Sequence, residues 1–120
     1  MIQRAIPVLH VSHSQAAEDF YCGKLGFRRD FADRGDSSDP CYMGVSRDGV
    51  ELHLSSLSGD GISGCAVILV VDDVDTLHVE FLAKHVSIAT GPVDQTWGTR
   101  EMYVKDADGN SIRFQQLRAG

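Results

Sequence analysis

The sequence predicts an α+β protein in which two βαβββ modules form one cupped mixed sheet. Asp48-Gly49 and Asp108-Gly109 lie half of the 120-residue chain apart, and each begins the pattern D-G-x-x-aliphatic-x-apolar, which indicates an internal repeat. Each half also opens with an apolar run, at residues 6–11 and 65–71, as expected of a buried strand. Apolar residues at helical spacing follow each run, so both halves begin with a strand and a helix.

In the first half, Ser12 or Ser14 is expected to cap the helix, because a hydroxyl can accept from free backbone N–H groups. Gly26 is expected to end the helix in a left-handed conformation. The apolar residues of this helix are Ala16, Ala17, Phe20, Tyr21 and Leu25. Three strands are predicted near residues 27–33, 41–46 and 50–56, with a tight hairpin at Asp48-Gly49 between the last two.

The second half repeats this order. A helix is predicted over residues 74–85, with Val74, Leu77, Phe81 and Leu82 on one face. Strands are predicted near residues 88–93, 100–105 and 111–116. Glycine and serine are frequent around residues 58–64, which indicates a linker. The predicted organisation is one domain over residues 1–120, with module one at 1–57, the linker at 58–64 and module two at 65–120.

Composition excludes several classes of protein. Hydrophobic residues make up 42% and charged residues 23%, as in ordinary globular domains. The net charge of −6 argues against nucleic-acid binding, which needs a basic surface, and is compatible with a cationic ligand. No apolar run is long enough to span a membrane. Cys22, Cys41 and Cys65 form no CxxC pair, so we expect free, buried thiols in a reducing cytoplasm.

Several motifs resemble the vicinal oxygen chelate superfamily, which holds glyoxalases, extradiol dioxygenases and bleomycin-resistance proteins. They are Phe20-Tyr21 with Leu25-Gly26-Phe27, Val70-Val71-Asp72-Asp73-Val74 and Asp106-Ala107-Asp108-Gly109-Asn110. Within the superfamily, Asp94-Gln95-Thr96-Trp97-Gly98 with Arg100-Glu101 is most similar to the Q-P-W-G-R-E motif of bleomycin-resistance proteins, with Thr96 in place of proline. The resemblance implies a homodimer, in which the first strand is often exchanged between subunits.

The resemblance also identifies four positions at which the superfamily's enzymes bind a metal ion. Here these positions align with Ile6, Glu51, Ala66 and Arg113. Only Glu51 has a side chain that can ligate a metal. We therefore expect no metal, no cofactor and no metal-dependent catalysis. The alternative is a metal-dependent lyase or dioxygenase with a different ligand set, made of His10, Glu51 and His53.

The leading hypothesis is a cytoplasmic protein that binds a planar, cationic small molecule, with drug sequestration of the bleomycin-resistance type as the implied function. A third hypothesis is binding of a metabolite unrelated to antibiotics. Trp97 and Phe31 could stack on the ligand or belong to the core. The acidic segment at residues 33–40 could be a lid or a hairpin connection. The candidate ligand-binding residues are His10, Asp30, Phe31, Glu51, His53, Ile68, Trp97, Arg113 and Gln115.

Overall fold

The computed structural model describes residues 1–34 and 38–118 of the chain. It divides into two compact units, Met1–Ser63 and Gly64–Gly120, each with its own four-stranded sheet. The elements follow in the order βαβββ in both units. The duplicated α+β module predicted from the repeat is therefore confirmed. Residues 35–37, in the segment considered as a lid, lie outside the described residues.

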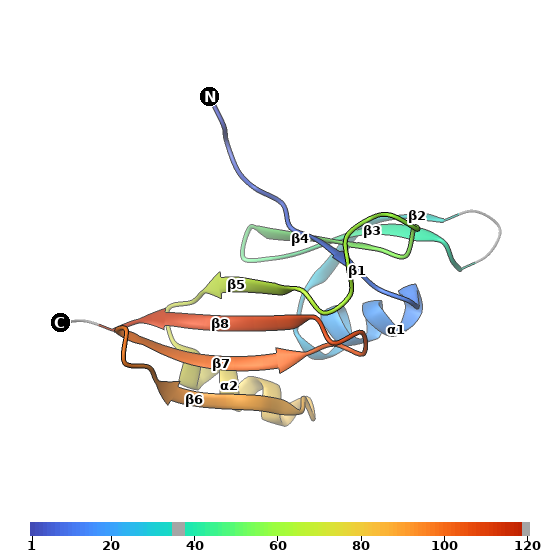
Figure 1. Ribbon diagram of the computed structural model, residues 1–120. Coiled ribbons are helices and arrows are strands. Elements are labelled where there is room, and N and C mark those ends of the chain that lie inside the picture. The colour runs from blue at the N-terminus through green and yellow to red at the C-terminus, as the bar shows by residue number, and fades with distance from the viewer. Residues whose placement is uncertain (35–37, 119–120) are drawn as a thin grey trace. The chain divides into compact units, whose positions relative to one another are not determined.

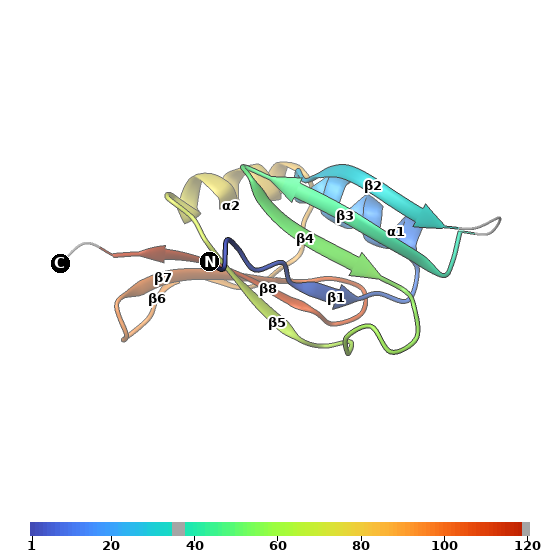
Figure 2. The same cartoon turned by 90° about the horizontal axis from the view of Figure 1, so that it is seen from above.

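The first unit pairs its strands in the order β1-β4-β3-β2, as Figures 1 and 2 show. β1 runs parallel to β4, whereas the β4–β3 and β3–β2 pairs are antiparallel. The helix α1 continues directly into a π-helical turn, η1. The elements are β1 (Val8–His10), α1 (Ser14–Glu18), η1 (Asp19–Lys24), β2 (Arg28–Arg34), β3 (Cys41–Arg47) and β4 (Val50–Ser55).

The second unit repeats this topology with the strand order β5-β8-β7-β6. β5 is parallel to β8, and the other pairs are antiparallel. The helix α2 packs against β6, β7 and β8 and covers one face of the sheet, as Figure 1 shows. The elements are β5 (Ala66–Val70), α2 (Val74–Ala83), β6 (Ile88–Asp94), β7 (Thr99–Lys105) and β8 (Ser111–Leu117).

Strand alternation sends every second side chain toward the helix of the same unit. In the first unit, Val45 and Leu52 are fully buried. In the second unit, Met102 and Ile112 are fully buried. Phe81 of α2 is likewise buried and meets the ring of Phe114 edge-on, with ring centroids 5.2 Å apart. Each such side chain contributes about 1.5–3 kcal/mol to folding. The opposite face of each sheet is not covered by the helix of its own unit. Its side chains include polar and aromatic groups.

The start of α1 differs from the prediction. His13, rather than Ser12 or Ser14, is the residue before the helix, and it makes no side-chain cap. The Ser14 N–H donates instead to the carboxylate of Asp39, at 3.2 Å, and the Ser14 hydroxyl donates to the Ser38 carbonyl. The helix terminus is thus satisfied by a segment that lies far along the chain, which local sequence patterns do not reveal.

Two smaller predictions are also corrected. Leu82 is 52% exposed, because it lies near the end of α2 and off the face that packs on the sheet. Among the cysteines only Cys41 is buried, while Cys22 and Cys65 are partly exposed and all three thiols are free. Gly26 does take the predicted positive φ, of 78°. Within the described ranges of the chain, no helix has the length and apolar character needed to cross a membrane.

Gly91 provides a test of the packing between β6 and β7. It has a φ of +82°, and a Cβ at this position would overlap the carbonyl oxygen of Glu101. We expect Gly91→Ala to lower the free energy of unfolding by about 1–2 kcal/mol from backbone strain and by about 1–3 kcal/mol more from overpacking. Gly109→Ala is the control, because Gly109 has a similar φ and open space around it. Equal losses in urea unfolding of the two variants would contradict the close approach.

Candidate functional site

The second unit carries a polar and aromatic surface on the face of its sheet that α2 does not cover. We call this surface the helix-free face of the second unit. Alternate residues of the two central strands contribute to it, together with residues of the edge strand β5 and of the loop at 95–98. Its members are Ile68, Val70, Trp97, Glu101, Tyr103, Arg113 and Gln115.

Glu101 is the centre of the hydrogen bonding on this face. Its side chain is only 3% exposed, and its two carboxylate oxygens accept four hydrogen bonds. The Tyr103 hydroxyl donates to Oε1 at 2.7 Å. The Trp97 indole N–H donates to Oε2 at 2.8 Å, and the Gln115 amide donates to the same oxygen at 3.2 Å. The Thr99 hydroxyl is the fourth donor. The carboxylate thus orients side chains from two strands and a loop.

These hydrogen bonds decide the ionisation of Glu101. Burial by itself would raise the pKa of the Glu101 carboxyl. Hydrogen bonds from Thr99, Tyr103, Trp97 and Gln115 outweigh burial and lower that pKa to about 2. The same interaction raises the pKa of the Tyr103 phenol, which donates to an anion. At neutral pH, Glu101 is therefore a fixed carboxylate whose oxygens are already occupied, a poor arrangement for a general base.

Trp97 presents the largest aromatic surface on the helix-free face of the second unit. Its side chain is 63% exposed, so the alternative that it belongs to the core is wrong. The indole is held by one edge through its N–H bond to Glu101. An aromatic ring fixed at its polar edge and open on its face is suited to stacking on a planar ligand.

Arg113 and its neighbours complete this face. The Arg113 guanidinium lies 4.9 Å from the centroid of the Tyr103 ring, and the two residues are cross-strand partners. Ile68 pairs with Arg113 across β5 and β8 and is 53% exposed. Gln115 pairs with Val70 and with Glu101. The predicted residues Ile68, Arg113 and Gln115 thus share one surface with Trp97.

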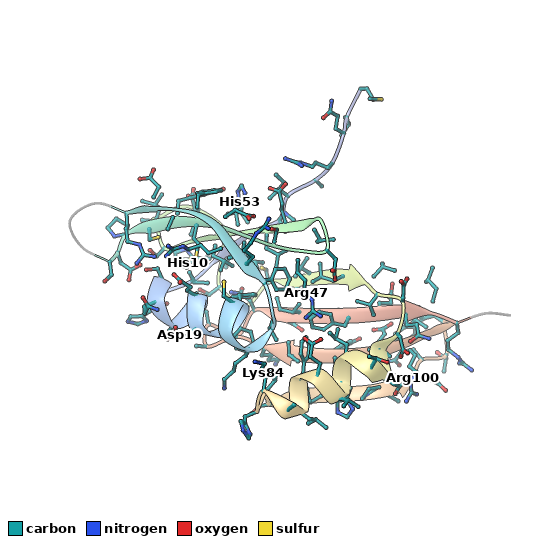
Figure 3. The ribbon with its side chains drawn as sticks, turned by 180° about the vertical axis from the view of Figure 1, so that it is seen from behind. His10, Asp19, Arg47, His53, Lys84 and Arg100 are labelled. Atoms are coloured by element: carbon teal, nitrogen blue, oxygen red, sulfur yellow. The ribbon has the colours of Figure 1, made fainter. Side chains whose placement is uncertain are left out.

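The first unit has its own helix-free face, with an aromatic cluster around His53. The His53 ring meets Phe31 and Tyr42 edge-on, with centroids 5.4 and 5.3 Å away. The Tyr42 hydroxyl and His53 Nδ1 are hydrogen-bonded at 2.8 Å. Figure 3 shows His53 on the side of the sheet away from α1. Phe31, which is 44% exposed, lies directly over Gly44, where any Cβ would overlap its ring.

Charged groups border this cluster. Glu51 forms an ion pair with Arg4 at 2.9 Å and lies 3.8 Å from His53 Nε2. Asp30 sits at the irregularity in the β2–β3 register. A side-chain hydrogen bond with Ser46, together with the hydrogen bond and charge of Arg28, lowers the pKa of the exposed Asp30 carboxyl. The candidate residues Asp30, Phe31, Glu51 and His53 therefore lie on one surface of the first unit.

His10 does not join the Glu51–His53 pair. Its Nδ1 lies 3.1 Å from the carbonyl oxygen of Asp60, in the loop after β4. Across residues 1–34 and 38–118, no three His, Cys, Asp or Glu side chains come close enough to hold a metal ion. The ligand set considered from the sequence, made of His10, Glu51 and His53, is therefore not assembled.

The four aligned superfamily positions do not fit a metal either. Ile6 and Ala66 have no donor atoms, and the Arg113 guanidinium is a donor of hydrogen bonds only. Glu51, the remaining position, is engaged by Arg4. Three of the four positions therefore cannot ligate a metal ion.

Three polar or aromatic residues of the two surfaces were missed by reasoning from the sequence. They are Tyr42, Glu101 and Tyr103. Their positions in strand alternation carry a usable signal: Tyr42 lies two residues before Gly44, and Thr99, Glu101 and Tyr103 share one side of β7. An acidic residue between two hydroxyl-bearing residues at alternate positions of a predicted strand is a pattern that the sequence alone contains.

Two βαβββ units in one chain, each with a polar and aromatic sheet face free of its own helix, define a class of proteins built by duplication of this module. A family model described as "Glyoxalase superfamily protein" matches residues 1–120. The chain therefore belongs to the glyoxalase superfamily. No curated protein sequence matches it.

Solved structures share this fold over nearly the whole chain. TnmS3, an antibiotic binding protein from Streptomyces sp. CB03234, is 25% identical, and the match covers 98% of this chain and 97% of that one with a TM-score of 0.79. A glyoxalase/bleomycin resistance protein from the same strain is 26% identical, with coverages of 95% and 100% and a TM-score of 0.76. A bleomycin-binding protein complexed with bleomycin is 23% identical, covers 98% and 100%, and has a TM-score of 0.78, which shows a shared fold.

The role of Glu101 can be tested by the pH dependence of stability. The folded-state pKa of Glu101 is about 2, below its ordinary value of 4.5. Its ionised form therefore stabilises the protein above pH 4.5, and this contribution is lost as the pH falls toward 2. We expect Glu101→Gln to lower the free energy of unfolding at neutral pH by about 1.5–3 kcal/mol. The difference from wild type should shrink between pH 4.5 and 2 in urea unfolding.

Asp72→Asn, which removes an exposed carboxylate of the second unit, is the control for this experiment. Its stability curve should run close to that of the wild-type protein. A Glu101→Gln curve that stays parallel to wild type down to pH 2 would show that the four donors do not stabilise the charged form.

Proposed function

We propose that this protein binds a planar small molecule and acts by sequestration, with an antibiotic as the ligand. The exposed indole of Trp97, held at its edge by Glu101, is the observation that carries the proposal. A ring held in place by the protein loses little freedom when a ligand stacks on it, so more of the stacking energy appears as affinity.

The antibiotic as ligand is supported by similarity to proteins with that role. TnmS3, described as an antibiotic binding protein, matches nearly the whole chain at 25% identity. The proposed ligand contacts are Ile68, Trp97, Arg113 and Gln115 on the second unit and His10, Asp30, Phe31, Glu51 and His53 on the first. His10 has the weakest support, because its ring is turned toward Asp60.

We also propose that binding requires no metal and leaves the ligand chemically unchanged. The superfamily's enzymes use the metal as a Lewis acid, and three of the four aligned positions here have no metal-ligating side chain. The buried carboxylate of Glu101 has its oxygens occupied by four donors. These features favour binding over catalysis.

The functional form is proposed to be a homodimer. The segment before β1 extends away from the sheet of the first unit (Figure 1), and Met1 and Ile2 are almost fully exposed. An exposed apolar segment next to an edge strand is suited to packing against a second copy. Exchange of β1 between the two copies is part of the same proposal.

Titration with metal-free bleomycin tests sequestration. We expect a saturable change in Trp97 fluorescence on protein shown to contain no metal, because Trp97 is the only tryptophan of the chain. Calorimetry should give the same affinity, and Trp97→Ala should weaken binding about 10-fold, or about 1.4 kcal/mol. Val79→Ala is the control, since Val79 is an exposed apolar residue of α2. Absence of binding in both measurements would remove bleomycin as the ligand.

The mass in solution tests the dimer. Light scattering after size exclusion should give twice the 13.1 kDa of one chain at micromolar concentration. Deletion of residues 1–5, which removes the exposed Met1 and Ile2 together with the Arg4 partner of Glu51, should shift the mass toward the monomer. A wild-type protein that stays monomeric at all concentrations would contradict the proposal.

A further inference from the structure

The helix-free face of the second unit contains a cation whose hydrogen-bonding capacity is not used. Arg113 Nε is enclosed, yet it has no hydrogen-bond partner among the described residues. Within those residues, its guanidinium forms no ion pair, and its one specific contact is with the Tyr103 ring. Enclosed polar groups in native proteins nearly always have a partner. Because Nε is enclosed, an acceptor from outside the described chain has to approach the Nη groups of Arg113.

The guanidinium is also held in position. It lies over the ring of its cross-strand partner, Tyr103. The Tyr103 hydroxyl is in turn bonded to Glu101 at 2.7 Å. A guanidinium that lies over an aromatic ring keeps its orientation, and its N–H groups can still donate hydrogen bonds in the plane of the guanidinium. Arg113 is thus prepared to bind a planar acceptor.

The nearest carboxylate of this face does not satisfy Arg113. Glu101 already accepts from Thr99, Trp97, Tyr103 and Gln115. Glu101 pairs with Gln115 across the strands, and Tyr103 pairs with Arg113. Arg113 is therefore a diagonal neighbour of Glu101, at roughly 7–8 Å between their backbones. Glu101 therefore accepts no hydrogen bond from the Arg113 guanidinium.

Apolar surface lies beside the guanidinium on β5. Ile68 is the cross-strand partner of Arg113, and it is 53% exposed. Val70, one pair further along, is 65% exposed. Trp97 reaches the same face through Glu101. Together these residues provide an aromatic ring on which a planar ligand can stack, apolar side chains that such a ligand can cover, and a guanidinium that can donate hydrogen bonds to it.

We propose that Arg113 binds an acidic group, a carboxylate or a similar planar oxyanion, on an aromatic ligand that stacks on Trp97. This inference rests on the proposed function and names the ligand class that the second unit selects. The net charge of −6 favours a cation at long range. On this face, however, the carboxylate is saturated by its neighbours and the cation is not, so short-range hydrogen bonding selects an anion.

Three matched probes test the selection without any mutation. They are anthracene carboxylate, the neutral anthracene carboxamide and the cationic anthracenylmethylamine, all substituted at the same ring position. We expect calorimetry to show that the wild-type protein binds the carboxylate at least 10-fold more tightly than the carboxamide, and the amine least tightly. Similar affinities for all three probes would overturn the role of Arg113 and leave the stacking function intact. Absence of binding by every probe would overturn the aromatic acid as the ligand class, and the bleomycin titration then decides the sequestration function separately.

Substitution then assigns the selectivity to one residue. Arg113→Gln should lower the affinity for the carboxylate about 10-fold while leaving the carboxamide affinity unchanged. Arg113→Lys should recover only part of the preference, because an ammonium group lacks the planar fork of donors. Arg118→Gln, which removes the same charge from an arginine paired with Asp94, should keep the wild-type preference. Equal weakening of carboxylate and carboxamide by Arg113→Gln would show that Arg113 only supports the surface and would overturn the proposal.

Discussion

One-sided burial of each sheet is the constraint on which the rest of this structure depends. A single helix can cover only one face of a four-stranded sheet. Because successive side chains of a strand point to opposite faces, half of the strand residues lie on the face without a helix. In the second unit, Met102 and Ile112 fill the covered face, while Glu101 and Arg113 come from the same two strands and point the other way. The uncovered face has to satisfy its polar groups without help from the helix.

The two units solve this problem with different chemistry. In the second unit, Glu101 is buried and fully hydrogen-bonded, and its charge is stabilised by neutral donors. In the first unit, Glu51 is partly exposed and pairs with an exposed partner, Arg4. A carboxylate held by several short-range donors is a rigid element that positions its neighbours, whereas an exposed ion pair contributes little to stability. The most extensively hydrogen-bonded part of these two faces therefore lies around Trp97 and Tyr103.

The net charge of this protein and the hydrogen-bonding groups of its second sheet favour ligands of opposite charge. The net charge of −6 describes the field that an approaching ligand meets at a distance. At contact, hydrogen-bonding capacity decides, and it depends on which groups have already been satisfied by their neighbours. Glu101 is satisfied four times and Arg113 by no acceptor within the described residues. A ligand preference inferred from composition alone can therefore differ from the one that a particular sheet face selects.

The sequence by itself determined the duplicated module, the order of its strands and helices, and the approximate strand positions. These features follow from local patterns: the D-G turns at Asp48 and Asp108, apolar runs and a period of two. Only the tertiary structure decided which partners those residues have. Ser14 is bonded by Asp39, His10 by Asp60, and Glu101 by donors from two strands and a loop. The contacts of Ser14, His10 and Gln115 join residues 25, 50 and 14 positions apart in the chain. The folding of the chain sets these contacts, because no local sequence pattern brings such residues together.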